Sequence, residues 1–404
     1  MSKMLPINQV VESVSITHKF DKPILKFLNT SDVENGKIIK INHLPIDELK
    51  GQAKKTIQKH DILFSEIRPK NRRFAYVDVD DTYDYVVSTK LMVLRNINPD
   101  VDNKYFYYFL TNDRMLAILQ DRAENRIGSF PQITFDLLSE YYIRVPELVD
   151  QQKIAFVLSA LDSKIELNNR INAELEAMAK TLYDYWFVQF DFPNNNGKPY
   201  KTSGGKMVWN EKLKREIPEG WEVKELQEIA KCIMGQSPKG ESYNQNGIGT
   251  PLLNGPADYE NGALKGRTFT TEPTRLCQKN DLVLCIRATI GNLVYSEQEF
   301  CLGRGVAAVR ANDRGLSELI YFLLIQEIER FKVQATGSII VGITKNDLIE
   351  SKCLIAKDDI IHSFHSQIKP QFDKIRINKK ENQKLIELRD WLLPMLMNGQ
   401  VKVN

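Results

Sequence analysis

The fold of this chain is decided by residues 151–190, QQKIAFVLSALDSKIELNNRINAELEAMAKTLYDYWFVQF. The stretch holds no glycine or proline, and its apolar residues recur at alternating steps of four and three. This is the heptad pattern of a helix that pairs with another helix along an apolar seam. At about 1.5 Å per residue, such a helix would extend for about 60 Å. The pattern therefore predicts a long spacer helix rather than a helix enclosed in one globular core.

A second stretch near the C-terminus carries the same pattern. Asn378 lies 210 residues after Asn168, and Asn382 lies 210 residues after Asn172, so each apolar stripe is interrupted twice at matching places. The same offset relates the apolar seam positions, which are Leu158, Ile165 and Leu175 in the first stretch and Ile368, Ile375 and Leu385 in the second. Asparagine in a seam costs stability but penalises wrong registers. We expect the helices to pair as an antiparallel coiled coil whose register the asparagines set; the alternative is two unrelated surface helices.

Pro370 interrupts the second pattern. Proline is tolerated in the first turn of a helix and breaks the interior. We therefore expect the second long helix to start near Lys369, after a shorter helix at 358–367.

The segments that flank the helices resemble each other. KHDILFSEIRP at 59–69 matches KNDLVLCIRAT at 279–289, and IGSFPQIT in the first segment matches TGSIIVGIT in the second. Short β-rich runs at 61–67, 74–79, 83–88 and 90–96 precede an expected helix at 104–120. The order domain, helix, domain, helix predicts an α+β fold made of two similar domains that alternate with two long helices, related by a pseudo-twofold axis.

The repeat sets the expected domain boundaries. They are a first globular domain at 1–148, a first spacer helix at 149–191, a connector at 192–216, a second globular domain at 217–357, and a second spacer helix with a C-terminal tail at 358–404.

Composition limits the classes of function. The chain has 404 residues, enough for two or three domains, and its net charge of +3 means that any nucleic-acid surface must be a local patch. The five cysteines are scattered without metal-type spacing, which suggests reduced thiols. No apolar run approaches a membrane span and the N-terminal residues lack a signal-peptide core, so we expect a cytoplasmic protein.

Basic residues gather in the loops where the two repeats differ. Arginine and lysine neutralise phosphates, arginine also grips guanine with two hydrogen bonds, and serine can hold phosphate oxygens. The alternative for any single basic residue is an ordinary solvated surface. The candidate DNA-binding residues are Arg68, Lys70, Arg72, Arg73, Arg126 and Ser129 in the first repeat, and Lys265, Arg267, Arg287, Arg304, Thr336 and Ser338 in the second.

Catalytic and metal-binding motifs are missing from the sequence. There is no GxxxxGK[ST] phosphate loop. The acidic run at 77–84 could bind a cation, but between two strands it is expected to be a turn. We therefore expect a non-catalytic chain without a metal site. The aromatic cluster LYDYWFVQFDF at 182–192 has two interpretations, core packing or a docking surface for a partner. The docking candidates are Tyr185 and Trp186, with Trp391 in the second helix.

Taken together, the whole chain resembles the specificity subunits of type I restriction–modification systems. The motifs that carry the resemblance are the two domain-plus-helix repeats, the stretch DYWFVQFDFPNNNGKPYKTSGGKMVWNEKLKREIPEGW, and the C-terminal LIELRDWLLPMLMNGQV. IRATIGN and CLGRGVAA also resemble one subfamily of target-recognition domains. The resemblance implies that each globular domain is a target-recognition domain that reads one half of a bipartite, asymmetric DNA site.

The resemblance also implies partners. The paired helices would set the gap between the half-sites and hold two methylation subunits, which use S-adenosylmethionine to methylate adenine, and two restriction subunits would complete the complex and cut DNA with ATP and Mg²⁺. No cofactor is expected in this chain. Two alternatives are the recognition part of a fused methyltransferase-nuclease, for which the NPPY-type motif is missing, and a coiled-coil adaptor without DNA contact.

Overall fold

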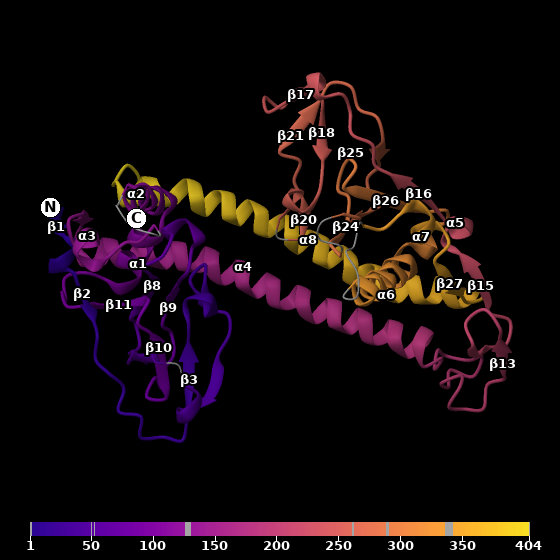
Figure 1. The fold of residues 1–404 in the computed structure, drawn as a ribbon, viewed down its shortest axis with the longest axis horizontal. Coiled ribbons are helices and arrows are strands. Elements are labelled where there is room, and N and C mark those ends of the chain that lie inside the picture. The colour runs from indigo at the N-terminus through magenta and orange to yellow at the C-terminus, as the bar shows by residue number, and fades with distance from the viewer. Residues whose placement is uncertain are drawn as a thin grey trace. The chain divides into compact units, whose positions relative to one another are not determined.

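A computed structural model describes residues 2–49, 51, 53–125, 131–260, 262–287, 291–335 and 342–403. The chain divides into two compact units, coloured along the sequence in Figure 1. Unit 1 comprises Met1–Ile165 and Gln383–Asn404, and unit 2 comprises Glu166–Asn382. Both contain strands and helices, so the predicted α+β class is confirmed. No helix in the described ranges is long and apolar enough to cross a membrane.

Unit 1 holds the first set of strands. They form a sheet with the order β2-β11-β8-β9, a second sheet with the order β6-β3-β10-β7, and the pairs β1-β12 and β4-β5. The strands are β1 Lys3–Pro6, β2 Val11–Val14, β3 Ile24–Leu28, β4 Val33–Glu34, β5 Lys37–Ile38, β6 Asn42–Pro45, β7 Ala53–Lys55, β8 Ile62–Ser65, β9 Phe74–Tyr76, β10 Tyr85–Ser88, β11 Leu91–Asn96 and β12 Tyr142–Val145.

Unit 2 repeats this arrangement. Its sheets have the orders β16-β26-β23-β24 and β17-β21-β18-β25-β22, beside the pairs β15-β27, β19-β20 and β13-β14. The strands are β13 Met207–Asn210, β14 Arg215–Pro218, β15 Glu222–Glu225, β16 Ala230–Met234, β17 Tyr243–Asn244, β18 Thr250–Leu253, β19 Tyr259–Glu260, β20 Ala263–Leu264, β21 Thr268–Thr270, β22 Leu276–Cys277, β23 Leu282–Cys285, β24 Leu293–Tyr295, β25 Phe300–Leu302, β26 Val306–Ala311 and β27 Lys352–Ile355.

The two units share one four-stranded sheet, whereas their second sheets have four strands in unit 1 and five in unit 2. In each, an antiparallel sheet joins four equivalent strands, β2-β11-β8-β9 in unit 1 and β16-β26-β23-β24 in unit 2. Each also has one parallel pair in its second sheet, β3 with β10 and β18 with β25. The central strands of the shared sheet, β8 and β11 in unit 1 and β23 and β26 in unit 2, are mostly buried, whereas the loops between the strands differ in length and composition.

Two expected helices differ from the structure. The helix expected at 104–120 is split into α1 Asn103–Thr111 and α2 Asp113–Glu124, because the Asn112 carboxamide accepts a hydrogen bond from the Met115 backbone N–H and starts a new helix. The expectation of a helix start near Lys369 is wrong: α8 runs without a break from Asp358 to Met397. Pro370 lies on the exposed side of α8, while Ile368 and Phe372 are buried on the other side, and this packing offsets the cost of about 3 kcal/mol for an interior proline.

The remaining helices are short except for α4 and α6. They are α3 Phe135–Ser139, α4 Leu148–Tyr183, which continues in one π-helical turn at Asp184–Val188, α5 Leu226–Ile229, α6 Ser317–Ala335 and α7 Lys345–Ile349.

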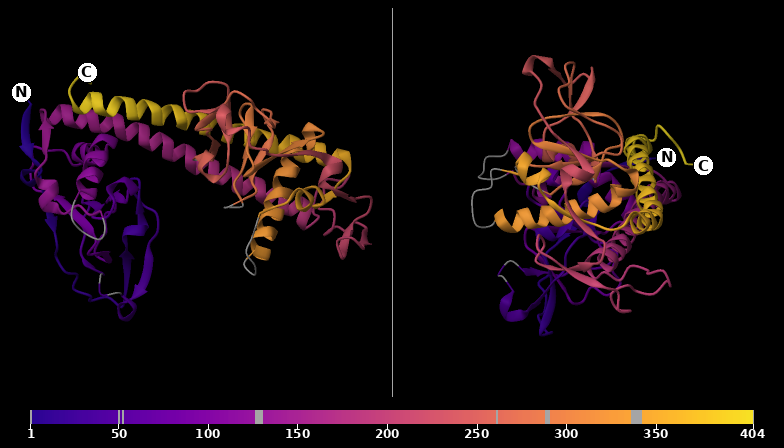
Figure 2. Two further views of the ribbon diagram at one scale, coloured as in Figure 1. Left: turned by 45° about the horizontal axis from the view of Figure 1, so that its top comes forward. Right: turned by 90° about the vertical axis from the view of Figure 1, so that its right-hand side faces the viewer.

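Within each unit, a part of α4 lies beside a part of α8 (Figures 1 and 2). In unit 1, Ile154 and Leu158 of α4 share a buried cluster with Leu393 and Leu396 of α8 and with the helices α1 and α2. In unit 2, Ala179, Tyr183 and Phe187 share a cluster with Phe364 and Phe372. Each globular core is therefore continuous with the helix pair that adjoins it.

Candidate nucleic-acid interface

The candidate basic residues of unit 1 lie on one tight turn between β8 and β9. Arg68 and Lys70 are exposed, and they flank Pro69 in a short 3-10 turn that spans Pro69–Asn71. Arg72 forms an ion pair with Asp113 at the start of α2. Arg73 lies 3.5 Å from a Glu34 carboxylate oxygen. Arg126 and Ser129 lie outside the described residues.

In unit 2 the candidates form two groups. Lys265 and Arg267 both lie near Glu260, with nitrogen–oxygen distances of 3.2 and 3.6 Å. Arg287 and Arg304 are exposed and lie on neighbouring chain segments, because the Ile286 N–H donates to the Gly305 carbonyl at 3.0 Å.

The Arg304 Nε lies 3.2 Å from the Ser237 Oγ. Among the described residues, no hydrogen bond or ion pair joins the group at 265–267 to Arg287 or Arg304. Thr336 and Ser338 lie outside the described ranges.

A buried ion pair holds the start of the equivalent strands β8 and β23 in both units. Arg95 on β11 donates to both oxygens of Asp61 at 2.9 and 2.8 Å. In unit 2, Arg310 on β26 donates to both oxygens of Asp281 at 2.8 and 2.7 Å. Each aspartate side chain is only 2% exposed and also accepts a backbone N–H, from Gln58 or from Gln278. The pair fixes the end of the strand opposite to the basic loop, so it positions that loop without contacting it.

The predicted seam asparagines meet in unit 2. Asn168 Nδ2 donates to Asn382 Oδ1 at 2.8 Å, and Asn378 Nδ2 donates to Asn172 Oδ1 at 2.8 Å. All four side chains are at most 7% exposed. A buried amide that lacks a partner is costly, so side chains placed this way hold the helices in one register.

The apolar seam positions vary in burial. Leu158, Ile368 and Ile375 are buried, whereas Ile165, Leu175 and Leu385 are half-buried.

The two interpretations of the aromatic cluster are separated by burial. Trp186 is only 3% exposed and packs against Phe364, with ring centroids 5.7 Å apart. The docking role predicted for Trp186 is therefore wrong, because this side chain of the π-helical turn belongs to the buried core of unit 2. Tyr185 is 36% exposed and Trp391 is 54% exposed, so both remain available as surface anchors.

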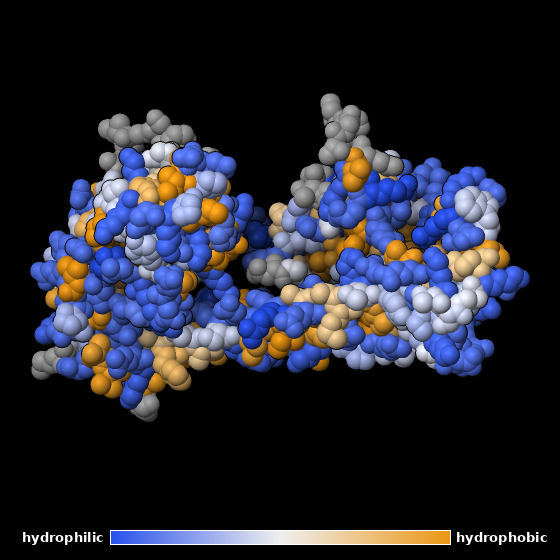
Figure 3. Space-filling model, turned by 90° about the horizontal axis from the view of Figure 1, so that it is seen from below, coloured by the Kyte–Doolittle hydropathy of each residue, from blue (hydrophilic) through white to orange (hydrophobic). Residues whose placement is uncertain are grey.

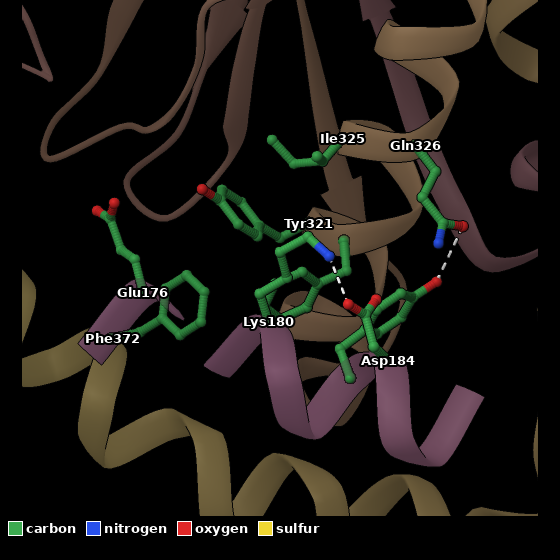
Figure 4. A pocket seen from close by; sticks show the side chains of 9 residues that line it. Glu176, Lys180, Asp184, Tyr321, Ile325, Gln326 and Phe372 are labelled. Carbon is green, nitrogen blue, oxygen red and sulfur yellow. Dashed lines mark hydrogen bonds and ion pairs between the residues drawn. The ribbon is translucent and has the colours of Figure 1, made fainter. Parts of the chain in front are cut away.

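Unit 2 also contains a cavity of about 180 Å³ between α4, α6 and α8 (Figure 4). Tyr321, Ile325 and Phe372 contribute to its apolar lining, and an ion pair between Lys180 and Asp184 lies at its edge. No group of three or more His, Cys, Asp or Glu side chains in the described part of the chain is arranged to hold a metal ion.

Sequence inspection did not single out three polar residues that the structure emphasises. Asp162 and Arg389 form an ion pair at 2.9 Å between α4 and α8, and Tyr108 donates to the same Asp162 carboxylate at 2.7 Å. Asp162 and Arg389 each lie four residues after a seam leucine, on the same face of the helix. Opposite charges at this spacing could therefore have predicted an ion pair between the two helices. Nothing in the sequence pattern indicated Tyr108, because its partner is remote in the chain.

Comparison with known proteins gives the family. The model for the type I restriction modification DNA specificity domain matches residues 6–177 and again residues 218–387. The chain therefore belongs to this family and contains its domain twice. It is a specificity subunit of a type I restriction–modification system, and the prediction of a non-catalytic recognition subunit is confirmed.

The HindI specificity subunit of Haemophilus influenzae is 28% identical over 96% of this chain and 97% of that protein. The MjaIX specificity subunit of Methanocaldococcus jannaschii is 28% identical over 76% of this chain and 72% of that protein. Among solved structures, the S subunit of a type I system from M. genitalium has a TM-score of 0.57 with 18% identity, and covers 98% of this chain and 96% of that one. At 18% identity, the similarity to the M. genitalium structure is a similarity of fold.

Proposed function

We propose that this chain selects DNA by reading the two halves of a bipartite, asymmetric site with two target-recognition domains, at 1–148 and 217–357. The proposal is supported by the shared framework of the two units and by their different loops. A common scaffold with divergent loops is what two different binding specificities need. A protein that selects sites on cellular DNA acts in the cytoplasm, so this function implies a cytoplasmic location.

The helices at 149–191 and 358–404 form the spacer in this proposal, joined to the second domain by the connector at 192–216. They would pair as an antiparallel coiled coil with a pseudo-twofold axis. One observation carries this part: the 210-residue repeat relates the two asparagine pairs to each other. Asn168 corresponds to Asn378 and its partner Asn382 corresponds to Asn172, and these two counterparts also bind each other. Their partners also run in opposite order along the two helices, as an antiparallel pair requires.

DNA contacts would come from the exposed basic loops. Arg68 and Lys70 in unit 1, and Arg287 and Arg304 in unit 2, are exposed cations that can reach phosphates or guanine edges. Arg72, Arg73, Lys265 and Arg267 lie within 4.0 Å of carboxylates, so we assign them a smaller share of the contacts. Arg126, Ser129, Thr336 and Ser338 stay candidates by sequence alone.

The outer faces of the helices would hold partner subunits. Exposed apolar residues occur at matching positions of α4 and α8: Leu167 and Ile377 are 39% and 60% exposed, and Met178 and Leu388 are 59% and 42% exposed. Each pair differs by 210 residues, so the same apolar surface occurs twice. Hydrophobic residues form small separate patches on the face drawn in Figure 3. Repeated surfaces of this kind fit two copies of one partner.

The partners in this proposal are two methylation subunits and two restriction subunits. S-adenosylmethionine, ATP and Mg²⁺ would bind to those subunits and not to this chain. The methylation subunits need the target adenine out of the base stack, so bound DNA would be distorted.

Salt-dependent DNA binding tests the proposal against a purely structural adaptor. A protein that contacts phosphates loses affinity steeply as salt rises, because counterions are released on binding. We expect the full-length chain with its methylation subunits to bind a bipartite duplex with a steep negative slope of log affinity against log salt. Affinity that does not change with salt or with sequence would contradict the recognition role.

Helix length provides the test of the spacer. Seven residues inserted after Leu175 and after Leu385 keep the seam phase and lengthen each helix by about 10 Å. At about 3.4 Å per base pair, the preferred gap should widen by about three base pairs, with weaker binding because the second domain is rotated around the duplex. The control is a variant with alanine substituted at two exposed helix positions, which keeps the helix length and should keep the original gap. A folded insertion variant that prefers the original gap would contradict the spacer role.

A further inference from the structure

The turn at Arg68–Arg72 in unit 1 is unusually well fixed for an exposed loop. Both Arg68 and Arg72 adopt left-handed backbone conformations, with φ of 46° and 53°. Residues other than glycine rarely adopt this conformation, because the Cβ approaches the carbonyl oxygen. Such strain persists only where the surrounding structure imposes it, and it is frequent at sites of function.

Hydrogen bonds from three directions impose the conformation. The Arg68 N–H donates to the Pro131 carbonyl at 3.1 Å, and the Arg72 carbonyl accepts from the Asn35 N–H at 2.9 Å. Between them, the Lys70 N–H donates to the Gln120 side-chain oxygen at 3.0 Å. Gln120 is 9% exposed and its Nε2 donates to a Glu124 carboxylate oxygen at 2.7 Å, so a buried and anchored side chain holds this exposed backbone. Pro69 is buried and fixes the start of the turn.

The side chains of the turn divide into two groups. Arg72 and Arg73 are engaged with Asp113 and Glu34 and thereby attach the turn to its own domain. Arg68, Lys70 and Asn71 are exposed, and within the described ranges their side chains make no hydrogen bond or ion pair. A rigid turn thus presents one amide next to two exposed cations.

We propose that Asn71 reads a base of the half-site bound by unit 1, and that this base is adenine. A carboxamide can accept from the adenine N6 amino group and donate to N7 in the major groove. Arg68 and Lys70 would contact the flanking phosphates and set the depth of the turn in the groove. Gln120 is a positioning residue, because it holds the Lys70 backbone N–H that immediately precedes Asn71. The inference rests on the proposed function, which it deepens by naming a base contact.

The test is selection of binding sites from a random DNA library by the full-length chain with its methylation subunits. Asn71→Asp keeps the shape of the side chain, but a carboxylate cannot donate to adenine N7 and accepts from cytosine N4 instead. We expect one position of one half-site to change from adenine to cytosine, with the other half unchanged. Affinity for the original site should fall about 10- to 100-fold.

Asn195→Asp is the matched control, since it makes the same charge change on an exposed asparagine of the connector. Gln120→Leu should relax the preference at the same position that Asn71→Asp changes, which a general loss of stability would not do. Arg68→Ala and Lys70→Ala should keep the consensus and lower the salt slope by about one each.

Two results would overturn the assignment of Asn71. One is the same consensus for Asn71→Asp and Asn195→Asp, and the other is a uniform loss of affinity for all sequences, which would indicate a phosphate contact. If the wild-type chain selects no consensus, the proposed function itself fails, and this outcome is distinct from the other two.

Discussion

Equivalent positions of the helix pair are occupied by charged residues in unit 1 and by apolar residues in unit 2. In unit 1, Asp162 of α4 binds Arg389 of α8 and the Tyr108 hydroxyl. Burial raises the pKa of Tyr108, which therefore stays a hydrogen-bond donor. Phe372 lies 210 residues after Asp162, and Ala179 lies 210 residues before Arg389. The same backbone positions thus carry a polar triad in one unit and a phenylalanine against an alanine in the other.

In unit 2, Phe372 instead packs edge-on against Tyr321 of α6, with ring centroids 5.1 Å apart. The difference shows that equivalent backbone positions of the repeat accept either a hydrogen-bonded polar triad or apolar packing. It also breaks the symmetry of the pairing. In an antiparallel pair of two α4 helices, Asp162 would lie opposite Ala179 and have no cation, so charge favours α8 as the partner of α4.

The largest effect should come from the feature that the two units share. Asp61→Ala and Asp281→Ala each remove a buried carboxylate that binds an arginine through two hydrogen bonds. Each change should lower the free energy of unfolding by about 3–5 kcal/mol, because a partly buried arginine loses its partner. Urea unfolding of the two variants measures this. A large loss in one unit with none in the other would show that the ion pairs are not equivalent.

The polar triad should give a smaller loss, since both side chains of its ion pair are about one-third exposed. Arg389→Ala should cost about 1–2 kcal/mol of unfolding free energy, less than a fully buried pair. The double variant Asp162→Phe with Arg389→Ala copies the residues of unit 2 and should recover part of the loss. A double variant whose loss equals the sum of the two single losses would show that the two positions are not coupled.

Alkaline pH should act in opposite directions on the buried thiols of unit 2 and on Lys55 of unit 1. Burial raises the pKa of the Cys232 and Cys285 thiols in unit 2 to about 11, whereas it lowers the pKa of Lys55 in unit 1. The thiols favour the folded state below their unfolded pKa near 9, and this contribution is lost as pH rises through 11. The contribution of Lys55 to stability rises with pH. Its pKa is lower in the folded than in the unfolded chain, so between these two values the unfolded chain binds more protons.

The loss from each thiol should be about 1 kcal/mol at pH 10. Thermal unfolding at pH 8 and pH 10 measures the loss, and Cys285→Val should reduce it. Lys55→Met is the control in unit 1 and should remove the opposing gain. A Cys285→Val variant with the same pH dependence as the wild type would contradict the assignment of the loss to this thiol.

The cavity of unit 2 should give the smallest effect. Ile325→Phe adds apolar volume next to Phe372 and should raise the free energy of unfolding by about 0.5–1 kcal/mol, as cavity filling commonly does. Leu324 is buried beside it in the sequence but does not line the cavity, so Leu324→Phe is the control and should be destabilising through overpacking. Equal destabilisation by both changes would show that the cavity cannot accept a larger side chain.

The sequence by itself determined the fold class, the repeat and the positions of the seam asparagines. Heptad spacing can be read from the sequence because the periodicity of a helix is a local property that does not depend on where the helix lies. The 210-residue offset then follows from comparing the two heptad patterns. For the same reason, the strands of the matched segments were found where their apolar alternation placed them. The family resemblance rested on the two domain-plus-helix repeats and on motifs such as LIELRDWLLPMLMNGQV.

Tertiary structure alone decided the fate of individual side chains. Pro370 stays within a continuous helix because its exposed position lets packing of Ile368 and Phe372 prevail over its local preference. Trp186 is buried because it packs against Phe364, and Arg72 is held by an ion pair with Asp113, whereas Arg68 is exposed. Such outcomes depend on contacts between residues far apart in the chain, and local sequence does not contain them.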